Sequence, residues 1–162
     1  MIDIISADLH QAAHGAAIVK LLNDYACDLM GGAEPLSEFC QTNLVSELQK
    51  RSNVHAFLAY VDGVPAGLCI CIEGFSTFAC KPLLNIHDLA VSPPFRGLGI
   101  AKRLLAAVEQ RAQQLGCCKI TLEVLQGNHK AQDIYASVGF AQYQLDPSTG
   151  GAIMMQKYLL AQ

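Results

Sequence analysis

The sequence predicts one α/β domain, residues 1–162, built on a mixed and mostly antiparallel β-sheet of about seven strands flanked by about four helices. Three observations lead to this fold class. The length of 162 residues fits a single domain, and a hydrophobic content of 52% suffices for one core. β-rich runs alternate with segments whose apolar residues recur at helical spacing. Glycine- and proline-containing turns separate these segments, with no internal repeat and no linker.

Seven strands are expected. Two β-rich runs flank Asp62-Gly63, a dipeptide that is typical of a two-residue hairpin turn. The residues after this hairpin, 73–84, are expected to form a loop because they include Gly74 and Pro82. The expected strands cover residues 2–6, 54–61, 64–72, 85–91, 119–125, 140–145 and 152–159.

Four helices are expected between these strands. The clearest covers residues 96–115, where the apolar residues form one stripe and Gly116 ends the helix. Ser37 and Asn128 stand where N-cap residues are expected. The expected helices cover residues 7–30, 37–50, 96–115 and 128–138.

The charges divide unevenly along the chain, although the net charge is only −3. Residues 1–95 hold four basic and ten acidic residues, a net charge of −6, whereas residues 96–162 hold seven basic and four acidic residues, a net charge of +3. A basic half suits an anionic ligand and an acidic half suits a cationic one, and chance scatter of surface charges explains the division equally well. No basic stripe interleaved with aromatic residues indicates nucleic-acid binding.

The cysteines and the apolar runs bear on metal binding, on disulfide bonds and on the compartment of the protein. Seven cysteines occur without CxxC or paired histidine spacing, so neither a metal site nor a disulfide framework is expected. Cys69 and Cys71 are expected to pack in the core. No apolar run approaches the roughly 20 residues that span a bilayer, and the first residues lack the basic start of a secretory signal. We therefore expect a cytoplasmic protein with no membrane partner.

A glycine-rich turn precedes the clearest helix. The first turn of a helix leaves backbone N–H groups unpaired and carries about half a positive charge. Small residues at Gly97, Gly99 and Ala101 let an anion approach those groups, while Arg96 and Lys102 add formal charge. Neither a Walker A loop nor a dinucleotide fingerprint is present. The turn by itself indicates either an anion site or close packing.

The surroundings of the turn resemble a known family. The strand Asn85-Ile86-His87-Asp88-Leu89-Ala90-Val91 leads into Arg96-x-x-Gly99-x-Ala101, which resembles the acetyl-CoA signature Gln/Arg-x-x-Gly-x-Gly/Ala of the GNAT superfamily of N-acetyltransferases. A second motif runs from the strand at 122–125 through Asn128, Ala131 and Tyr135 to Gly139-Phe140. Both motifs occur in family order over residues 85–140, which the resemblance implies to be the cofactor-binding core.

The resemblance implies acetyl-CoA as the cofactor, bound where the sheet splays between the fourth and fifth strands. The backbone of Leu89, Ala90 and Val91 would hold the pantetheine arm, and Arg96 would add charge beside the pyrophosphate. Asn128 would contact the cofactor or act only as a helix cap, and Lys130 and Lys102 would reach the 3′-phosphate or remain solvated. The pyrophosphate would lie against the backbone amides of Gly97, Leu98, Gly99, Ile100, Ala101 and Lys102.

The resemblance also assigns the catalytic groups. Tyr135 would protonate the leaving thiolate, or would pack against the sheet. Strict alternation places Asn85, His87, Leu89 and Val91 on one face of their strand, and that face looks into the acceptor pocket in many relatives. His87 is therefore the first choice of base, because its ordinary pKa of about 6.5 suits proton acceptance at neutral pH. A structural role for His87 and a role for Asp88 as base stay open.

The expected reaction is direct acetyl transfer from acetyl-CoA to a primary amine of a small, cationic acceptor. The acceptor side would draw on the first two helices and the 73–84 segment, with Tyr25, Asp28, Glu34, Phe75 and Asp88 as candidate substrate contacts. Two alternatives remain: acetylation of a protein or peptide amine, and a non-catalytic acyl-CoA-binding module. A homodimer is left open.

Overall fold

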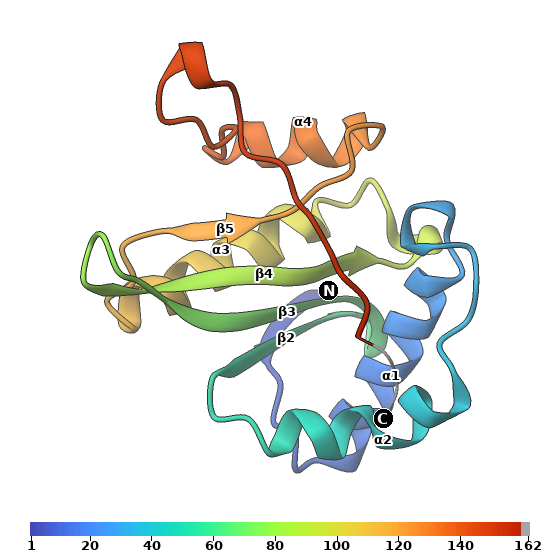
Figure 1. Ribbon diagram of the computed structural model, residues 1–162. Helices are drawn as coiled ribbons and strands as arrows, with labels where there is room; N and C mark the ends of the chain where they lie inside the picture. Colours follow the sequence, from blue (N-terminus) through green and yellow to red (C-terminus); the bar gives the residue numbers. More distant parts are fainter. Residues whose placement is uncertain (160–162) are drawn as a thin grey trace. The chain divides into compact units, whose positions relative to one another are not determined.

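The computed structural model describes residues 1–159 and contains one mixed sheet with strand order β1-β2-β3-β4-β5 (Figure 1). The first four strands pair antiparallel, and β5 pairs parallel to β4. The α/β class, the mixed sheet and the four α-helices confirm the prediction. The strands are β1 (Ile2–Ser6), β2 (Val54–Val61), β3 (Val64–Ser76), β4 (Lys81–Val91) and β5 (Ile120–Leu122).

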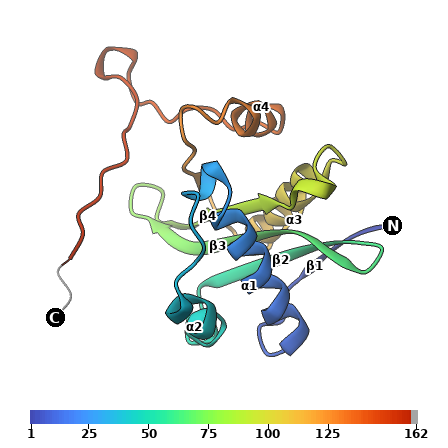
Figure 2. The same ribbon diagram turned by 90° about the vertical axis from the view of Figure 1, so that its right-hand side faces the viewer.

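The chain divides into two compact units, and the first, Met1–Leu125, contains the whole sheet. Helices α1 (Ala12–Ala26) and α2 (Glu38–Gln49) cover one face of the sheet, and α3 (Ile100–Gln114) covers the other (Figures 1 and 2). Two 3-10 turns, η1 (Leu29–Gly31) and η2 (Pro93–Phe95), follow α1 and precede α3. The core under α1 consists of Ala17, Ile18, Leu21, Ala56, Leu58, Leu68 and Ile70.

The second unit begins at Gln126 and contains α4 (His129–Ser137) and the 3-10 turn η3 (Pro147–Thr149). The Asn128 side chain accepts a hydrogen bond from the Ala131 N–H at 3.2 Å, so its expected N-cap role is confirmed. Ser37 caps α2 in the same way, through the Cys40 N–H at 3.1 Å.

The Asp62-Gly63 hairpin is confirmed. Both residues have positive φ angles, 48° and 81°, which is the conformation of a type I′ turn. Val61 and Val64 form the last strand pair before the turn. Asp62 tolerates this conformation because a short polar side chain is among the least strained there.

The prediction of a loop at residues 73–84 was wrong. Strand β3 continues to Ser76 and β4 begins at Lys81, with Phe75 opposite Pro82. Pro82 lacks an N–H but keeps its carbonyl, which accepts a hydrogen bond from the Cys118 N–H at 2.8 Å. A proline is tolerated near the open edge of a sheet, so it did not end this strand.

The prediction of two closing strands was also wrong. Between residues 140 and 159 the β-structure of the described backbone is limited to an isolated antiparallel bridge between Gln144 and Gly151. The sheet of the described residues therefore has five strands instead of about seven, and the strand expected at 119–125 is reduced to Ile120–Leu122. A β-rich pattern becomes a strand only where a neighbouring strand satisfies its backbone groups. Residues 160–162, part of the expected domain, lie outside the described residues.

No helix within residues 1–159 is both long enough and apolar enough to cross a membrane.

Gly67 on β3 brings the start of α3 close to the sheet. A Cβ atom at this position would lie 3.0 Å from the Ala90 carbonyl oxygen and 3.2 Å from Cγ2 of Ile100. Ile100 and Leu104 are almost completely buried, so neither can move aside without loss of packing. The missing side chain at residue 67 therefore sets the distance between the first turn of α3 and strands β3 and β4.

We expect Gly67→Ala to lower the free energy of unfolding by about 1–3 kcal/mol, because overpacking forces α3 or β4 to shift. Urea unfolding measures this change. Gly74→Ala is the matched control on the same strand, since its Cβ would meet only the side chain of Leu83. An equal loss in both variants would contradict this reason.

Candidate active site

The turn Gly97-Leu98-Gly99 presents the N-terminus of α3 without a cap. Gly99 is the N-cap residue, no side chain caps the helix, and the first turn of α3 contains no acidic residue. Gly97 and Gly99 adopt positive φ angles of 84° and 76°, which glycine adopts without strain. Ile100 anchors the turn in the core, and Lys102 is exposed.

The turn fits a phosphate group. A Cβ atom at Gly97 or Gly99 would meet no atom within 4 Å, so the space before the helix is open. The first N–H groups of α3 carry the positive end of the helix dipole and lack a side-chain acceptor. An anionic group can supply the missing acceptors.

Strand β4 contains a β-bulge at His87. Ile86 lies opposite Cys71 and Asp88 lies opposite Ile70, the residue that immediately precedes Cys71, so His87 is one extra residue in β4. On the other side, β4 pairs with β5 only over Leu84–Ile86. Within the described residues, the part of β4 from His87 to Val91 has no strand partner on that side.

The bulge changes which edge of β4 the backbone N–H and C=O groups face. Before it, the Leu84 N–H donates to the Lys119 carbonyl, on the β5 side. After it, the Ser92 N–H donates to the Ala66 carbonyl, on the β3 side. The N–H groups of Leu84 and Ser92, both even-numbered, thus face opposite edges of β4. Because backbone groups alternate between the two edges, those of Leu89 and Val91 face the open edge. Those of Ala90 face β3.

The bulge also overturns the expected side-chain alternation. Asp88 and Ala90 lie opposite Ile70 and Leu68, on the face that α1 covers. Leu89 and Val91 lie opposite Cys69 and Gly67, on the face of α3. The prediction that Asn85, His87, Leu89 and Val91 share one face was wrong, because it assumed an unbroken strand. His87 is exposed at the bulge.

Tyr25, Asp28 and Asp88 form an acidic cluster at the end of α1. Burial raises the pKa of the Tyr25 hydroxyl, and the nearby charges of Asp88 and Asp28 raise it further. Burial also raises the pKa of Asp88, while the positive charge of a protonated His87 acts in the opposite direction. The Tyr25 hydroxyl donates a hydrogen bond to the Met30 carbonyl at 3.3 Å. Three of the predicted substrate contacts thus lie together.

Arg96 joins this cluster to the glycine turn. Its Nη2 donates to Oδ2 of Asp28 at 2.8 Å, and its Nε donates to the Val91 carbonyl at 3.0 Å. The hydrogen bond from Arg96, followed by that from the Met30 N–H, holds the pKa of Asp28 below its ordinary value. Sequence reasoning assigned Arg96 and Asp28 to different ligands and did not connect them.

Of the other predicted site residues, Glu34 follows the cluster in the chain, Phe75 lies apart from it, and the rest belong to the second unit. Glu34 is exposed on the segment that follows η1, and its N–H donates to the Ala26 carbonyl. Phe75 is 60% exposed and lies five residues along β3 from the position opposite Asp88, a separation of about 17 Å. Tyr135 and the exposed Lys130 belong to α4. The rings of Tyr135 and Phe140 pack edge to face, with their centroids 5.8 Å apart.

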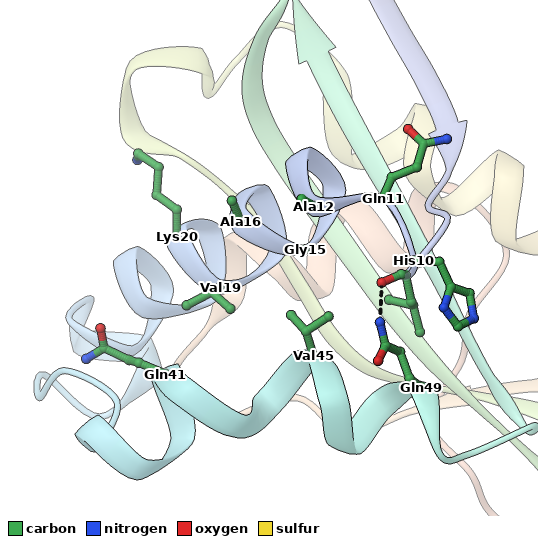
Figure 3. A pocket seen from close by; sticks show the side chains of 11 residues that line it. His10, Gln11, Ala12, Gly15, Ala16, Val19, Lys20, Gln41, Val45 and Gln49 are labelled. Carbon is green, nitrogen blue, oxygen red and sulfur yellow. Dashed lines mark hydrogen bonds between the residues drawn. The ribbon is translucent and has the colours of Figure 1, made fainter.

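Two further features of the structure are not marked by any sequence motif. His55 on β2 accepts a hydrogen bond from Arg111 Nε at 3.3 Å, and its other ring nitrogen lies 3.3 Å from a carboxylate oxygen of Glu73. An open groove runs between the first half of α1 and α2, where Gln49 donates to the Leu9 carbonyl at 2.7 Å (Figure 3). The groove lies at the opposite end of α1 from Tyr25.

Metal-ligating groups do not gather in the described part of the chain: it contains no cluster of three or more histidine, cysteine or acidic residues with suitable geometry. The seven cysteines are unpaired. Cys69 and Cys71 are buried on one face of β3 with their sulfur atoms 3.6 Å apart, and their hydrogen bond together with burial raises the pKa of Cys69.

Comparisons with known proteins agree with this geometry. The sequence model of the acetyltransferase (GNAT) family matches residues 18–140. A thialysine N-epsilon-acetyltransferase of Caenorhabditis elegans is 28% identical over 131 residues, which cover 76% of this chain and 81% of that protein. A ribosomal protein bS18-alanine N-acetyltransferase of Haemophilus ducreyi is 38% identical over 91 residues, or 49% of this chain and 63% of that protein.

Solved structures show the same fold. A probable acetyltransferase matches with a TM-score of 0.80 and 21% identity over 96% of this chain and 98% of its own. The aminoglycoside N-acetyltransferase AAC(6')-Iy in complex with CoA matches with a TM-score of 0.73 and 20% identity over 97% and 95%.

An uncapped helix N-terminus without an acidic residue in its first turn is suited to bind an anionic group such as a phosphate. The chain belongs to the acetyltransferase (GNAT) family, whose sequence model spans well over half of it. Its enzyme class is that of the N-acetyltransferases.

We expect Gly99→Ala to weaken CoA binding about tenfold, which corresponds to about 1.4 kcal/mol. An alanine in the left-handed region is strained by about 1–2 kcal/mol, and the turn relieves this strain by moving the amides away from the phosphate. Titration calorimetry with CoA measures the Kd.

Gly116→Ala is the matched control for this substitution. Gly116 has a φ of 69° with no atom within 4 Å of its Cβ position, at the other end of α3. Its replacement carries the same strain and leaves the Kd unchanged. Equal Kd values for both variants and the unchanged protein would contradict a phosphate site at the turn.

Proposed function

We propose that the protein transfers an acetyl group from acetyl-CoA to the primary amine of a small, cationic acceptor by direct attack of that amine. The observation that carries this proposal is the open edge of β4 at Leu89 and Val91, which ends beside the uncapped N-terminus of α3. The acidic cluster on the α1 side of the same strand supplies the place for the amine. Residues 1–162 are proposed to act as one domain, because the family match crosses both units.

The chain's own groups suit the cofactor, which supplies the activated acetyl thioester when it is bound. The backbone of Leu89 and the N–H of Val91 would hold the pantetheine arm as an added strand would, while the Val91 carbonyl keeps its hydrogen bond from Arg96 Nε. The amides from Gly97 to Lys102 would hold the pyrophosphate. Asn128 and Lys130 are proposed contacts from the second unit, and Lys102 and Lys130 are the proposed partners of the 3′-phosphate.

The open edge of β4 would also serve the acetyl carbonyl. The Leu89 N–H faces the open edge, whereas the Ala90 groups face β3, so Leu89 is the proposed donor to the developing oxyanion. A backbone donor held by the sheet needs no reorganisation during the reaction. Tyr135 is proposed to protonate the leaving thiolate.

The amine must lose a proton before it attacks, because an alkylammonium has a pKa of about 10. We assign this task to His87, whose side chain is exposed next to Asp88. Asp88, with Tyr25 and Asp28 beside it, would hold the ammonium group. Glu34 is proposed to add negative charge to the acceptor side of the site. Phe75 is proposed to contact only acceptors long enough to reach it.

Relatives act on amines of this kind. The names of several relatives specify thialysine, ornithine and aminoglycosides as acceptors, and one specifies a ribosomal protein alanine. The acidic cluster favours the small cationic amines over the protein N-terminus. Seven unpaired cysteines favour a reducing compartment, and we propose the cytoplasm.

The experiment that tests the function measures release of free CoA thiol from acetyl-CoA with four acceptors: thialysine, ornithine, an aminoglycoside and a peptide that begins with alanine. We expect the three small amines to react and the peptide to react far more slowly. Faster reaction of the peptide would favour the protein-directed alternative, and no reaction with tight CoA binding would favour a non-catalytic module.

We expect Tyr135→Phe to lower kcat about a hundredfold, since positioned acids contribute at least that much, with the KM for acetyl-CoA little changed. Steady-state kinetics with the best acceptor measures both values. Tyr158→Phe, at an 85% exposed tyrosine of the same unit, is the control and should retain full activity. Full activity of Tyr135→Phe would contradict the proposed role.

We expect Asp88→Asn to lower kcat/KM for the amine at least tenfold, because the ammonium loses its charged partner. The same variant should be more stable than the wild type at pH 7. Burial raises the pKa of Asp88, so the protonated form stabilises the fold at low pH and that stabilisation is lost as the pH rises.

Thermal unfolding at pH 7 and near pH 4 tests the sign of this effect. The gain in Tm should shrink at the lower pH, because a larger fraction of the wild-type Asp88 carboxyl is protonated there than at pH 7. Asp3→Asn, at an exposed aspartate on β1, is the control and should change neither Tm nor kcat/KM. An unchanged kcat/KM in Asp88→Asn would exclude Asp88 from acceptor binding.

A further inference from the structure

The guanidinium of Arg96 forms hydrogen bonds with two other residues of the chain. The residue stands directly before the glycine turn, yet its guanidinium turns back to the Val91 carbonyl at 3.0 Å and to the Asp28 carboxylate at 2.8 Å. The two acceptors belong to the end of β4 and to the segment after α1. One side chain therefore links the end of β4 and the turn before α3 to the segment after α1, which is 68 residues away in the sequence.

Asp28 in turn holds the segment that follows α1, residues 28–33, which we call the 28–33 loop. Its Oδ1 accepts a hydrogen bond from the Met30 N–H at 3.0 Å, and its carbonyl accepts from Gly31 at 2.9 Å and Ala33 at 3.0 Å. The loop packs closely against the end of α1 at Gly31, where a Cβ atom would lie 2.0 Å from the Tyr25 carbonyl oxygen.

The contribution of the ion pair to stability is small. The side chains of Arg96 and Asp28 are 43% and 25% exposed, and pairs of that kind add little to the free energy of unfolding. The contribution of the pair is geometric. A planar guanidinium donates from several N–H groups in a rigid fork, whereas the three donors of a lysine ammonium rotate about one nitrogen and fix no direction. If Arg96 turned toward a phosphate instead, the Asp28 carboxylate would lose its cationic partner beside Asp88 and Tyr25.

We propose that Arg96 is a positioning residue that fixes the 28–33 loop against the end of β4 and so couples the cofactor turn to acceptor binding. The proposal deepens the proposed function and rests on it for the identity of the two ligands. It assigns to the arginine of the cofactor signature an effect on the amine, through Asp28 and the loop, in place of a direct phosphate contact.

The first test is a set of KM values at saturating concentrations of the other substrate, with the acceptor that reacts fastest in the panel above. We expect Arg96→Ala and Arg96→Lys each to raise the acceptor KM about fivefold, the lower end of common coupling effects. Asp28→Asn should raise it at least as much, because it also removes a negative charge beside the ammonium group. The double variant Arg96→Lys/Asp28→Asn should be no worse than Asp28→Asn alone, because the link is already broken in that variant.

Lys102→Ala is the matched control, a cation of the same turn that is exposed to solvent. It should raise the KM for acetyl-CoA and leave the acceptor KM unchanged. A direct phosphate role for Arg96 gives a different result: Arg96→Lys would then keep the acceptor KM of the wild type, and Arg96→Ala would behave as Lys102→Ala does. Either of these outcomes would overturn the proposal.

A second readout needs neither ligand nor activity. Amide hydrogen exchange of Met30, Gly31 and Ala33 should be at least fivefold faster in Arg96→Lys than in the wild type, because Asp28 is no longer held. Unchanged exchange at these amides would overturn the proposal even if the enzyme is active. Faster exchange in a protein that acetylates none of the four acceptors would support the link and refute the proposed function instead.

Discussion

One extra residue in strand β4 is the constraint on which the site depends. With His87 inserted, the backbone of Leu89 and Val91 faces away from β3, toward an edge that β5 leaves open. The same insertion moves Asp88 to the side of α1, where Tyr25 and Asp28 lie. A strand without the bulge would present the Ala90 groups to the open edge and would place Asp88 on the face of α3. The open edge of β4 and the acidic cluster thus have one common origin.

The remaining parts of the site follow from close packing around that strand. Gly67 lets α3 begin directly against β3 and β4, so the positive end of the helix lies near the end of the open edge. Burial raises the pKa of Asp88, so the ionised form of this carboxyl lowers the stability of the fold at neutral pH. The ion pair between Arg96 and Asp28 joins the turn before α3 to the segment after α1.

The glycine turn and the helix that follows it could be predicted from the sequence, since a glycine turn before an amphipathic helix is a local pattern. The Asp62-Gly63 hairpin and the cap at Asn128 are local in the same sense. The bulge at His87 could not be predicted, because the register of β4 depends on which residues of β3 lie opposite. The sequence of β4 is equally compatible with an unbroken strand whose side chains alternate between the two faces. The expected strands at 140–145 and 152–159 failed for a related reason: their pattern shows β propensity but not a pairing partner.

Residue-resolved amide hydrogen exchange of β4, with and without CoA, tests the account most directly. The Leu89 and Val91 amides should exchange rapidly in the free protein and slow markedly when CoA is added, because they face the open edge. The Ala90 amide, which faces β3, should be protected in both states. Protection of Leu89 and Val91 before CoA is added, or no change at either when it binds, would contradict the shifted register and the cofactor edge built on it.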